Sequence, residues 1–590
     1  MLSGGAPTLT EADSAGNTYV AGVFSGTTTF GAFSLSSGGG EDAFVGRLDS
    51  TGAWQWVQRV GGSGADQIKR LRLDARHNAV LLVGAAPAGG TVGTTALPSA
   101  GDYVARLNAA TGAVRWAVGA EGAADVGAHR NGNLVVCGTF SLSLTLGTHT
   151  VQDPSTFSAS ELYVAGLDSI GVWSWLVGGG GEGDAEGQYV AVAANGDVIV
   201  GGRYMSMFDD PTFGQYAIPV SGGVDFNYFV AKLNSARTWQ WARGVTNADR
   251  SDLADMALDA AGNVYLAAHG NDAPALNNTP LFPMTVTGND EFYILSLTPG
   301  GTVRSVTRQT AAAVPSQTQS RRLRLVDNDK LMISGWMDAG ATIQLGNYAL
   351  SAPATPAFPV FFGVLDGTSQ WQWAEVLPDV WNWAYARRHR LTFAGTFAQS
   401  SYAFGSTTLT NTQPPNTPQG FVAQRGLPAL VDAFSPATGP AGTIVTLTGV
   451  GFAGTTAVLV GGVPAVFTVL GNGQVQITIP PGLPTGGAGV LIQVVGPNGT
   501  SLSPTRFQPR PVGLAEASAP LAFQLAPNPA RGDVRVVGLP AAAQLTVLDC
   551  AGRVVSATTI GADATLHLHG LAPGVYTVRA GVVARRLVIE

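Results

Sequence analysis

Four kinds of short apolar segment recur in a fixed order along residues 1–427, and no other feature of the chain constrains its fold as strongly. The first kind runs into an acidic or polar turn, as in Leu71-Arg-Leu-Asp74, and the second follows that turn, as in Asn263-Val-Tyr-Leu-Ala-Ala268. The third alternates apolar and polar residues, as in Asp42-Ala-Phe-Val-Gly-Arg-Leu-Asp49, and the fourth carries tryptophan, as in Trp54-Gln-Trp56. Short alternating runs bounded by turn residues predict β-strands.

The repeat predicts a closed ring of four-stranded sheets. The second and third kinds occur seven times and the tryptophan kind six times, at a spacing of about 55–68 residues and with no helical periodicity. A stack of such units has to close on itself or be capped, and neither end of the array resembles a cap. We therefore expect an all-β chain with a seven-bladed β-propeller over residues 1–427. Tryptophans in nearly every unit favour core packing over a carbohydrate-stacking surface, because a binding site needs one such surface.

A further recurrent piece, between the second and third segments, explains the length of the units. It consists of an apolar residue, a glycine, three more residues and another apolar residue, as in Phe30-Gly31 followed by Leu35. Glycine between short apolar runs suits the tight turn of an extra hairpin. The fifth unit departs from the pattern, with Phe282-Pro283 where the glycine would be.

The seventh unit is predicted to lack its fourth strand, because Arg425 leads directly into a segment of different composition. Residues 1–7 are the predicted source of the missing strand, since Met1-Leu-Ser-Gly-Gly5 parallels Gln58-Arg-Val-Gly-Gly62 after a tryptophan pair. They would pair with the seventh blade near Gly420–Arg425 and cover its free edge. The tryptophan part would then lie upstream of Met1, so we expect the natural chain to begin earlier, which also explains the absence of a signal peptide in residues 1–7.

Composition excludes several classes of partner. The 590 residues carry a formal charge of -7, with 12% charged residues and only three lysines. No basic patch stands out, so we expect no nucleic-acid partner. No run of roughly eighteen apolar residues exists, so we expect no transmembrane segment. Cys137 stands where related segments carry Ala or Gly and should be a small buried residue, and Cys550 lies in a different zone, so we expect no disulfide between them.

The repeated units carry a resemblance. The segments Gly262-Asn-Val-Tyr-Leu-Ala267, Asp42–Asp49 and Trp54–Trp56 resemble the SBBP-type β-propeller repeats of bacterial secreted proteins, and the resemblance extends over residues 1 to about 427. It implies the propeller architecture and says little about the ligand, because this fold carries many unrelated functions.

Residues 431–508 alternate short strands with Gly/Pro turns, as in Ile444-Val-Thr-Leu-Thr-Gly449, Gly461-Gly-Val-Pro-Ala465 and Ile477-Thr-Ile-Pro480. The pattern resembles an IPT/TIG domain, which implies an immunoglobulin-like β-sandwich that acts as a spacer or adhesion module. Some IPT/TIG domains bind DNA, but Arg506 is the only basic residue of this stretch, so the sequence does not favour DNA here.

The end of the chain indicates a destination. Residues 509–520 form a Pro/Ala/Ser-bearing linker, and residues 521–590 contain period-two strands that predict a small β-sandwich. This last segment resembles the C-terminal sorting domain of the type IX secretion system. The residues that carry the resemblance are Pro527, Asn528, Pro529, Gly552, Arg553, Gly574, Tyr576 and Arg586. The resemblance implies the type IX secretion machinery as a partner, removal of this domain, and an extracellular or outer-surface location. Arg585 and Arg586 stand where the family usually has lysine.

Two patterns could bind metal. The acids Glu182, Asp184 and Glu186 in a Gly-rich turn, together with Asp209-Asp210, could hold Ca²⁺ through carboxylate oxygens, although they match no complete Ca²⁺-loop motif. His567-x-His569 places two imidazoles on one strand face. No third ligand lies near this pair in the sequence, so we expect a surface pair rather than a metal site. We expect no other cofactor.

No local motif predicts catalysis. The chain has no Gly-x-Ser-x-Gly elbow, no His-Glu-x-x-His and no phosphate-binding loop before a helix. The basic run Arg387-Arg-His-Arg390 is interpreted as a solvated turn, with an anionic ligand as the alternative. We therefore predict a secreted or cell-surface, non-catalytic binding or scaffold protein whose propeller presents loops to an extracellular glycan or protein. The alternative is a secreted hydrolase or lyase that acts on polysaccharide with acids converging at the central channel.

Overall fold

The computed structural model describes residues 3–98, 100–153, 160–181, 184–205, 210–219, 227–246, 251–270, 273–283, 291–311, 318–326, 330–354, 359–377, 382–386, 390–397, 399–404, 407–414, 417–511, 523–539, 543–561, 565–581 and 583–590. The chain divides into two compact units, residues 1–438 with 442–508 and residues 439–441 with 509–590. β-Strands dominate the described residues, and the helical turns η1 (Ala75–His77) and η3 (Phe452–Gly454) are each a single 3₁₀ turn. No helix in these ranges is long and apolar enough to cross a membrane.

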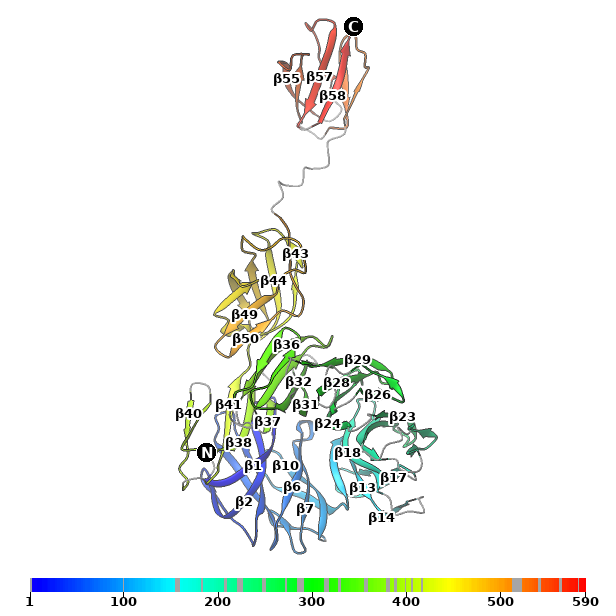
Figure 1. Cartoon of the computed structure of the whole chain (residues 1–590), viewed down its shortest axis with the longest axis vertical. Coiled ribbons are helices and arrows are strands. Elements are labelled where there is room, and N and C mark those ends of the chain that lie inside the picture. Colours follow the sequence, from blue (N-terminus) through cyan, green and yellow to red (C-terminus); the bar gives the residue numbers. More distant parts are fainter. Residues whose placement is uncertain are drawn as a thin grey trace. The chain divides into compact units, whose positions relative to one another are not determined.

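Seven antiparallel sheets make up the N-terminal part of the first unit, and Figure 1 shows them from blue to green. From the innermost strand outward they are β1 (Ser3–Ala12), β2 (Thr18–Phe30), β4 (Asp42–Leu48), β5 (Trp54–Gly61); β6 (Gln67–Asp74), β7 (Ala79–Ala86), β10 (Gly101–Asn108), β11 (Val114–Gly119); β12 (Ala123–Ala128), β13 (Leu134–Phe140), β16 (Glu161–Leu167), β17 (Trp173–Gly179); β18 (Asp184–Val192), β19 (Val198–Met205), β22 (Asn227–Leu233), β23 (Trp239–Thr246); β24 (Ser251–Leu258), β25 (Val264–Gly270), β28 (Glu291–Leu297), β29 (Val303–Arg308); β31 (Thr318–Val326), β32 (Lys330–Met337), β35 (Val360–Leu365), β36 (Trp371–Leu377); and β37 (Asn382–Ala386), β38 (Arg390–Phe397), β41 (Gln419–Gly426).

These sheets form the predicted seven-bladed β-propeller. The innermost strands contact one another in sequence from β1 to β6, β12, β18, β24 and β31, and β37 contacts β1. The Arg322 guanidinium of β31 donates a hydrogen bond to the Trp383 carbonyl of β37, which completes the ring. Within the described residues, the seventh sheet has three strands where the sheets before it have four, as the count of tryptophan segments predicted.

The prediction that residues 1–7 supply the fourth strand of the seventh sheet is wrong for the described residues 3–7. The strand β1 pairs with β2, from Ser3 opposite Thr29 to Ala12 opposite Thr18, and is the innermost strand of the first sheet. It contacts the strands of the seventh sheet without being hydrogen-bonded to them as a strand. The reason lies in the turn that follows β1, where the Asp13 carboxylate accepts a hydrogen bond from the Asn17 N–H at 2.9 Å. In this repeat, the segment that runs into an acidic turn forms the first, innermost strand of its sheet, and residues 3–12 follow that rule.

A β-bulge recurs on the innermost strands and explains the glycines of the second strands. The pairing with the second strand shifts at Pro7/Leu9, Ile68/Arg70, Ala123/Asp125, Gly187/Tyr189, Leu253/Asp255 and Ser320/Arg322. The bulge presses a carbonyl onto the facing strand: a Cβ at Gly202 would lie 1.8 Å from the Glu186 oxygen, and one at Gly84 would lie 2.5 Å from the Gln67 oxygen. The bulge also turns the residue that follows it toward the centre of the ring.

The tryptophans bind one blade to the next, which confirms their predicted packing role. In three sheets, the last tryptophan of the fourth segment donates its Nε1–H to a carbonyl in the turn before the outer strand of the following sheet. The distances are 3.1 Å from Trp56 to Ala109, 3.0 Å from Trp116 to Ser169 and 3.1 Å from Trp241 to Pro299. This hydrogen bond satisfies the polar atom of a large ring that is otherwise packed between blades.

Extra hairpins are present between second and third strands. They are formed by β3 (Phe33–Ser36) with the end of β2, β8 (Thr91–Val92) with β9 (Thr95–Ala96), β14 (Ser143–Leu146) with β15 (His149–Gln152), β20 (Thr212–Phe213) with β21 (Tyr216–Ala217), β26 (Ala275–Leu276) with β27 (Thr279–Pro280), β33 (Thr342–Leu345) with β34 (Tyr348–Ser351), and β39 (Ser401–Phe404) with β40 (Thr407–Thr410).

Positive φ at one position explains the glycine of these hairpins. Gly31, with a φ of 60°, opens the turn of the first hairpin, as a type II′ turn requires. The fifth hairpin instead turns at Asn277 and Asn278, whose φ values are 46° and 64°. The turn therefore lies before Phe282-Pro283 and not at it, because two successive asparagines tolerate the left-handed conformation of a type I′ turn.

The second part of the first unit is a β-sandwich. One sheet contains β42 (Leu430–Ser435), β44 (Ile444–Val450), β48 (Gln474–Thr478) and β47 (Val466–Gly471), and the other contains β46 (Val463–Pro464), β45 (Ala457–Val460), β49 (Ile492–Gly496) and β50 (Gly499–Leu502).

This sandwich is packed directly onto the propeller. Leu427 and Leu430 belong to the same buried cluster as Trp383 of the seventh sheet. The Arg425 guanidinium binds the Glu375 carboxylate and also donates to a sandwich carbonyl, that of Asn498, at 2.9 Å. The sandwich is therefore held against the sixth and seventh sheets by apolar and charged contacts.

The second unit contains the predicted small C-terminal sandwich (Figure 1, red). One sheet contains β52 (Gln524–Ala526), β53 (Val534–Val537) and β56 (Thr565–Leu566). The other sheet contains β55 (Val554–Ile560), β54 (Ala543–Leu548), β57 (Gly574–Ala580) and β58 (Val583–Ile589). Alternate residues such as Val534, Leu545, Val578 and Leu587 are buried between them.

Candidate functional site

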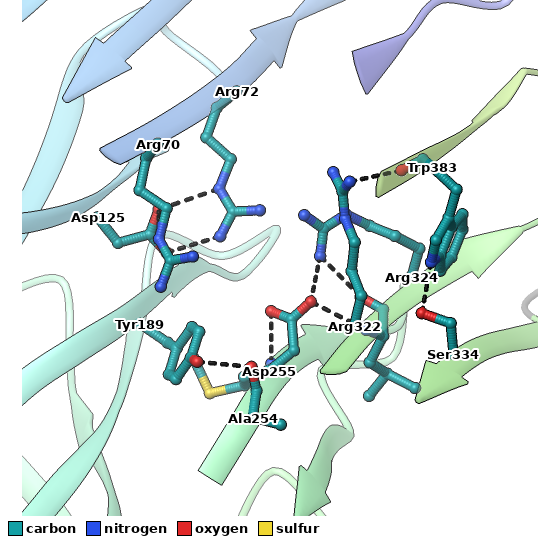
Figure 2. A network of polar contacts seen from close by, with 12 residues as sticks. Arg70, Arg72, Asp125, Tyr189, Ala254, Asp255, Arg322, Arg324, Ser334 and Trp383 are labelled. Carbon is teal, nitrogen blue, oxygen red and sulfur yellow. Dashed lines mark hydrogen bonds and ion pairs between the residues drawn. The ribbon is translucent and has the colours of Figure 1, made fainter. Parts of the chain in front are cut away.

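The centre of the propeller holds a connected set of charged side chains, which we name the channel network (Figure 2). Its members come from the innermost strands β1, β6, β12, β18, β24 and β31. They are Glu11, Arg70, Arg72, Asp125, Tyr189, Asp255, Arg322 and Arg324. Five of these stand at the position that follows a bulge, which is why they face inward together: Arg70, Asp125, Tyr189, Asp255 and Arg322.

Asp125 joins three blades. Its fully buried carboxylate accepts two hydrogen bonds from Arg72 of the second sheet, at 3.0 and 2.7 Å, and one from the Val190 N–H of the fourth sheet, at 3.1 Å. The Arg70 Nε lies 3.8 Å from the same carboxylate. Burial alone would lower the pKa of Arg72, but the charge and hydrogen bonds of Asp125, together with the Asp255 and Glu11 charges, outweigh burial and raise the pKa above its ordinary value.

Asp255 makes a second junction, between the fifth and sixth sheets. Its Oδ2 accepts hydrogen bonds from the Leu323 N–H at 2.9 Å and from the Arg324 guanidinium at 2.6 Å. Burial acts to raise the pKa of Asp255, but the charges of three arginines and the Leu323 N–H hydrogen bond together outweigh burial and lower it. This carboxylate is therefore ionised at neutral pH and is engaged by the protein itself.

Arg322 reaches across the channel to the strand on which the ring closes. Its guanidinium donates to the Thr10 carbonyl at 2.6 Å and lies 3.2 Å from the Glu11 carboxylate. It also lies 5.6 Å from the ring centre of Trp383, in cation–π contact. Burial and the neighbouring Arg324 charge lower the pKa of Arg322 to about 9, which indicates that its charge is incompletely compensated.

The network separates two cavities at opposite ends of the channel, because the innermost strands all run in the same direction. The first mouth, a cavity of about 470 Å³, is lined by the later residues of these strands, including Glu11, Arg72, Asp74, Arg76, Val190 and Arg324. The second mouth, of about 460 Å³, is lined by earlier residues of these strands, including Arg70, Gln188, Tyr189, Asp252 and Arg321, and by His269 of the second strand β25. Arginines outnumber carboxylates in both linings.

Two of the predicted Ca²⁺ residues, Asp184 and Glu186, lie within the described part of the chain, and both contact protein groups. Glu182 and Asp209 lie outside the described residues. The Asp184 carboxylate accepts a hydrogen bond from the Ser160 N–H at 2.7 Å. The Glu186 carboxylate binds the Arg203 guanidinium through two hydrogen bonds, of 2.7 and 3.0 Å. Both carboxylates are thus engaged by protein groups, and the Ca²⁺ site stays a prediction.

Two further predictions concern the cysteines and the basic run at residues 387–390. Cys137 is buried and Cys550 is exposed, and both are free thiols, as expected. In the basic run, residues 387–389 lie outside the described residues, and Arg390 is exposed at the start of β38.

Glu161 is a buried acid that sequence reasoning missed. It begins β16, is 1% exposed, and accepts a hydrogen bond from the Gly181 N–H at 3.0 Å. Burial and then the Asp153 charge raise the pKa of Glu161 to about 9. The sequence signal for such a residue is an acid at or next to the start of third strands, as at Asp42 and Asp102.

The residues of the predicted sorting motif support the C-terminal sandwich. Asn528, between Pro527 and Pro529, accepts a hydrogen bond from the Val588 N–H at 2.9 Å and donates to the Arg586 carbonyl at 2.7 Å, so it fixes the last strand.

The remaining motif residues shape turns of the same sandwich. Arg553 follows Gly552, whose φ is 76°, and donates from Nε to Asp549 at 2.9 Å. Tyr576, two residues after Gly574, donates from its hydroxyl to the Ala572 carbonyl at 2.8 Å.

Comparison with known proteins identifies one domain. A sequence model of the IPT/TIG domain family matches residues 429–509, in agreement with the predicted sandwich. No curated protein matches the chain.

Several solved structures are similar to the chain at low identity. A protein of unknown function from Bacteroides caccae is 10% identical and covers 49% of this chain and 78% of its own, with a TM-score of 0.28. The extracellular region of plexin A4 is 9% identical and covers 99% of this chain and 84% of its own, with a TM-score of 0.25. PorZ of Porphyromonas gingivalis, described as an essential bacterial surface component of the type IX secretion system, is 11% identical and covers all of both chains, with a TM-score of 0.14. TM-scores this low carry no argument about function.

Proposed function

We propose that this chain is an extracellular, non-catalytic binding protein whose propeller is a rigid platform for an anionic ligand. The channel network carries the proposal. Each of its carboxylates, Glu11, Asp125 and Asp255, lies within 3.5 Å of an arginine nitrogen, so these acids hold the blades together and none is free to exchange a proton with a substrate.

The ligand class follows from the charges at the mouths. The network has four arginines against three carboxylates, and the first mouth adds the exposed Arg76 at its rim. An excess of guanidinium groups in a concave, partly apolar cavity favours carboxylate or sulfate groups, which guanidinium binds in bidentate geometry. A uronic-acid or sulfated glycan, or an acidic segment of a protein, fits this chemistry.

A glycan array tests this proposal. The full chain is expected to bind acidic polysaccharides in preference to neutral ones, and Arg76→Ala is expected to weaken that binding by about tenfold, as loss of a charge-assisted hydrogen bond implies. Arg579→Ala, which removes an exposed arginine of the C-terminal sandwich, is the matched control and should bind as the wild type does. Equal binding of neutral and acidic glycans, or no effect of the Arg76 change, would refute the anionic-ligand proposal.

Export by the type IX secretion system is the second part of the proposal. It is supported by the motif at Asn528, Arg553 and Tyr576 and by the autonomy of the second compact unit. Residues 521–590, fused behind a signal peptide and a reporter in a type IX-competent bacterium, should place the reporter outside the cell. Retention of the reporter in the periplasm would contradict this destination.

The alternative function, a hydrolase or lyase, has one observation in its favour. Glu161, with a pKa of about 9, is protonated at neutral pH as a general acid must be. However, it is 1% exposed and therefore out of contact with any substrate. Turnover of a polysaccharide that disappears in Glu161→Gln would overturn the non-catalytic proposal.

A further inference from the structure

Three metal-ligating side chains converge on the surface of the C-terminal sandwich. Asp533 immediately precedes β53, and His567 and His569 follow β56. The two strands pair with Val534 opposite Leu566, so the next position outward places Asp533 opposite His567. His569 lies two residues further on, and the ligand atoms of all three residues lie within 4.8 Å of one another. The third ligand is thus far away in the sequence and adjacent in the sheet.

Only one of the two contacts between the imidazoles and the carboxylate is a hydrogen bond. His567 Nδ1 lies 2.8 Å from one Asp533 oxygen, and His569 Nε2 lies 3.6 Å from the other. The longer separation exceeds the range of a hydrogen bond. By contrast, two donors that each bind a tetrahedral ion at 2.0–2.1 Å lie about 3.3 Å apart, which is between the two observed values.

The orientation of the imidazoles supports the same reading. Their planes are 9° apart and their centres are separated by 6.2 Å, so the two rings stand side by side over one carboxylate. The side chains of His567 and His569 are 69% and 83% exposed. An ion from solvent can therefore reach all three groups without any rearrangement of the sandwich.

We propose that Asp533, His567 and His569 form a binding site for a divalent transition metal of the zinc class. Two imidazole nitrogens and one carboxylate oxygen make a ligand set that suits Zn²⁺ and its first-row neighbours and is too poor in oxygen for Ca²⁺. Three protein ligands leave at least one position for water or for a donor from another molecule. The bound ion would join the ends of β53 and β56, which pair at two positions within the described residues.

Zinc titration of the full chain tests the site. Chelator-treated protein is titrated with ZnCl₂ in a calorimeter, with the metal alone as the probe. The wild type is expected to bind one equivalent that Asp533→Asn, His567→Gln and His569→Gln each weaken by about tenfold or more, because loss of a ligand costs at least as much as loss of an outer partner. All three residues are at the surface, so the variants should keep the circular dichroism spectrum of the wild type.

A histidine outside the cluster provides the matched control. His149→Gln in the propeller hairpin removes one imidazole and should leave the zinc equivalent unchanged. Hydrogen exchange is an independent readout: Zn²⁺ should slow exchange at β53 and β56 in the wild type and not in Asp533→Asn. Zinc binding that survives Asp533→Asn and both histidine changes, or the absence of a specific equivalent in the wild type, would overturn the proposal.

Discussion

Replacing the central carboxylate of the channel network should loosen three blades at once. Asp125→Asn keeps an oxygen for the Val190 N–H but removes the charge that two arginines share. Removing one partner of a buried ion pair costs about 3–5 kcal/mol, because the other charge stays buried without compensation. The Arg72 side chain is 21% exposed, so water screens part of its charge. We therefore expect a loss near the bottom of that range, about 3 kcal/mol.

A double-mutant cycle separates the ion pair from general disruption. Arg72→Met removes the cation, and the combination Asp125→Asn/Arg72→Met should cost less than the sum of the two single changes by about 2 kcal/mol. Hydrogen exchange of peptides from β6, β12 and β18 is the appropriate assay, because a ring of repeated sheets need not unfold as a single two-state unit. It reports the opening free energy of each innermost strand separately.

The control lies in the same sheet as Asp125. Asp168 accepts hydrogen bonds from the Ile170 and Val172 N–H groups in an exposed turn, at 3.0 and 2.8 Å. Asp168→Asn should affect only exchange near that turn, by about 1 kcal/mol or less. A coupling below about 0.5 kcal/mol between Asp125 and Arg72, or no change in β18, would refute the view that the network ties the blades together.

Three further predictions concern single positions. The pKa of Glu161 in the folded protein, about 9, exceeds the ordinary value of 4.5, so between these pH values the native state binds a proton that the unfolded state does not. The free energy of unfolding should therefore fall as pH rises through that window. Thermal melts at about pH 5, 7 and 9 should show this decrease in the wild type and not in Glu161→Gln. Gly202→Ala places a Cβ 1.8 Å from the backbone carbonyl oxygen of Glu186 and should destabilise the fourth sheet by about 1–3 kcal/mol in denaturant titrations. The control Gly367→Ala, whose Cβ meets nothing within 4 Å, should leave stability unchanged. Asn528→Ala loses two hydrogen bonds to the last strand and should cost the C-terminal sandwich about 1–3 kcal/mol, measured as faster hydrogen exchange of β58; unchanged exchange there would contradict its bracing role.

The repeated strands were predictable from sequence because their signals are local. A run such as Asn263–Ala268 alternates and is bounded by turn residues wherever it occurs, so counting the copies gave the number of sheets. The same logic was available for residues 3–12 and was missed. Asp13 and Asn17 repeat the spacing of Asp259 and Asn263, and the carboxylate accepts the asparagine N–H in both turns.

The channel network was beyond sequence reasoning for a physical reason. Arg70, Asp125 and Asp255 read as ordinary polar positions of alternating strands. A bulge shifts the alternation by one residue and so decides which side chains face the channel. The metal cluster was missed for a related reason, since Asp533 meets His567 only through the pairing of β53 with β56.

At the seam of the propeller, the described residues of the first and last sheets share no strand. The sequence of the seventh unit also contains no tryptophan segment after Arg425 to bind it to the first sheet. Polar contacts take that place: Thr18 and Thr392 hydroxyls lie 3.0 Å apart, and Arg322 contacts both Trp383 of β37 and Thr10 of β1. One guanidinium therefore connects the sixth, seventh and first sheets at the point where the two ends of the array meet. The channel network as a whole carries four arginines against three carboxylates, and an anionic ligand is proposed to bind beside this excess of positive charge.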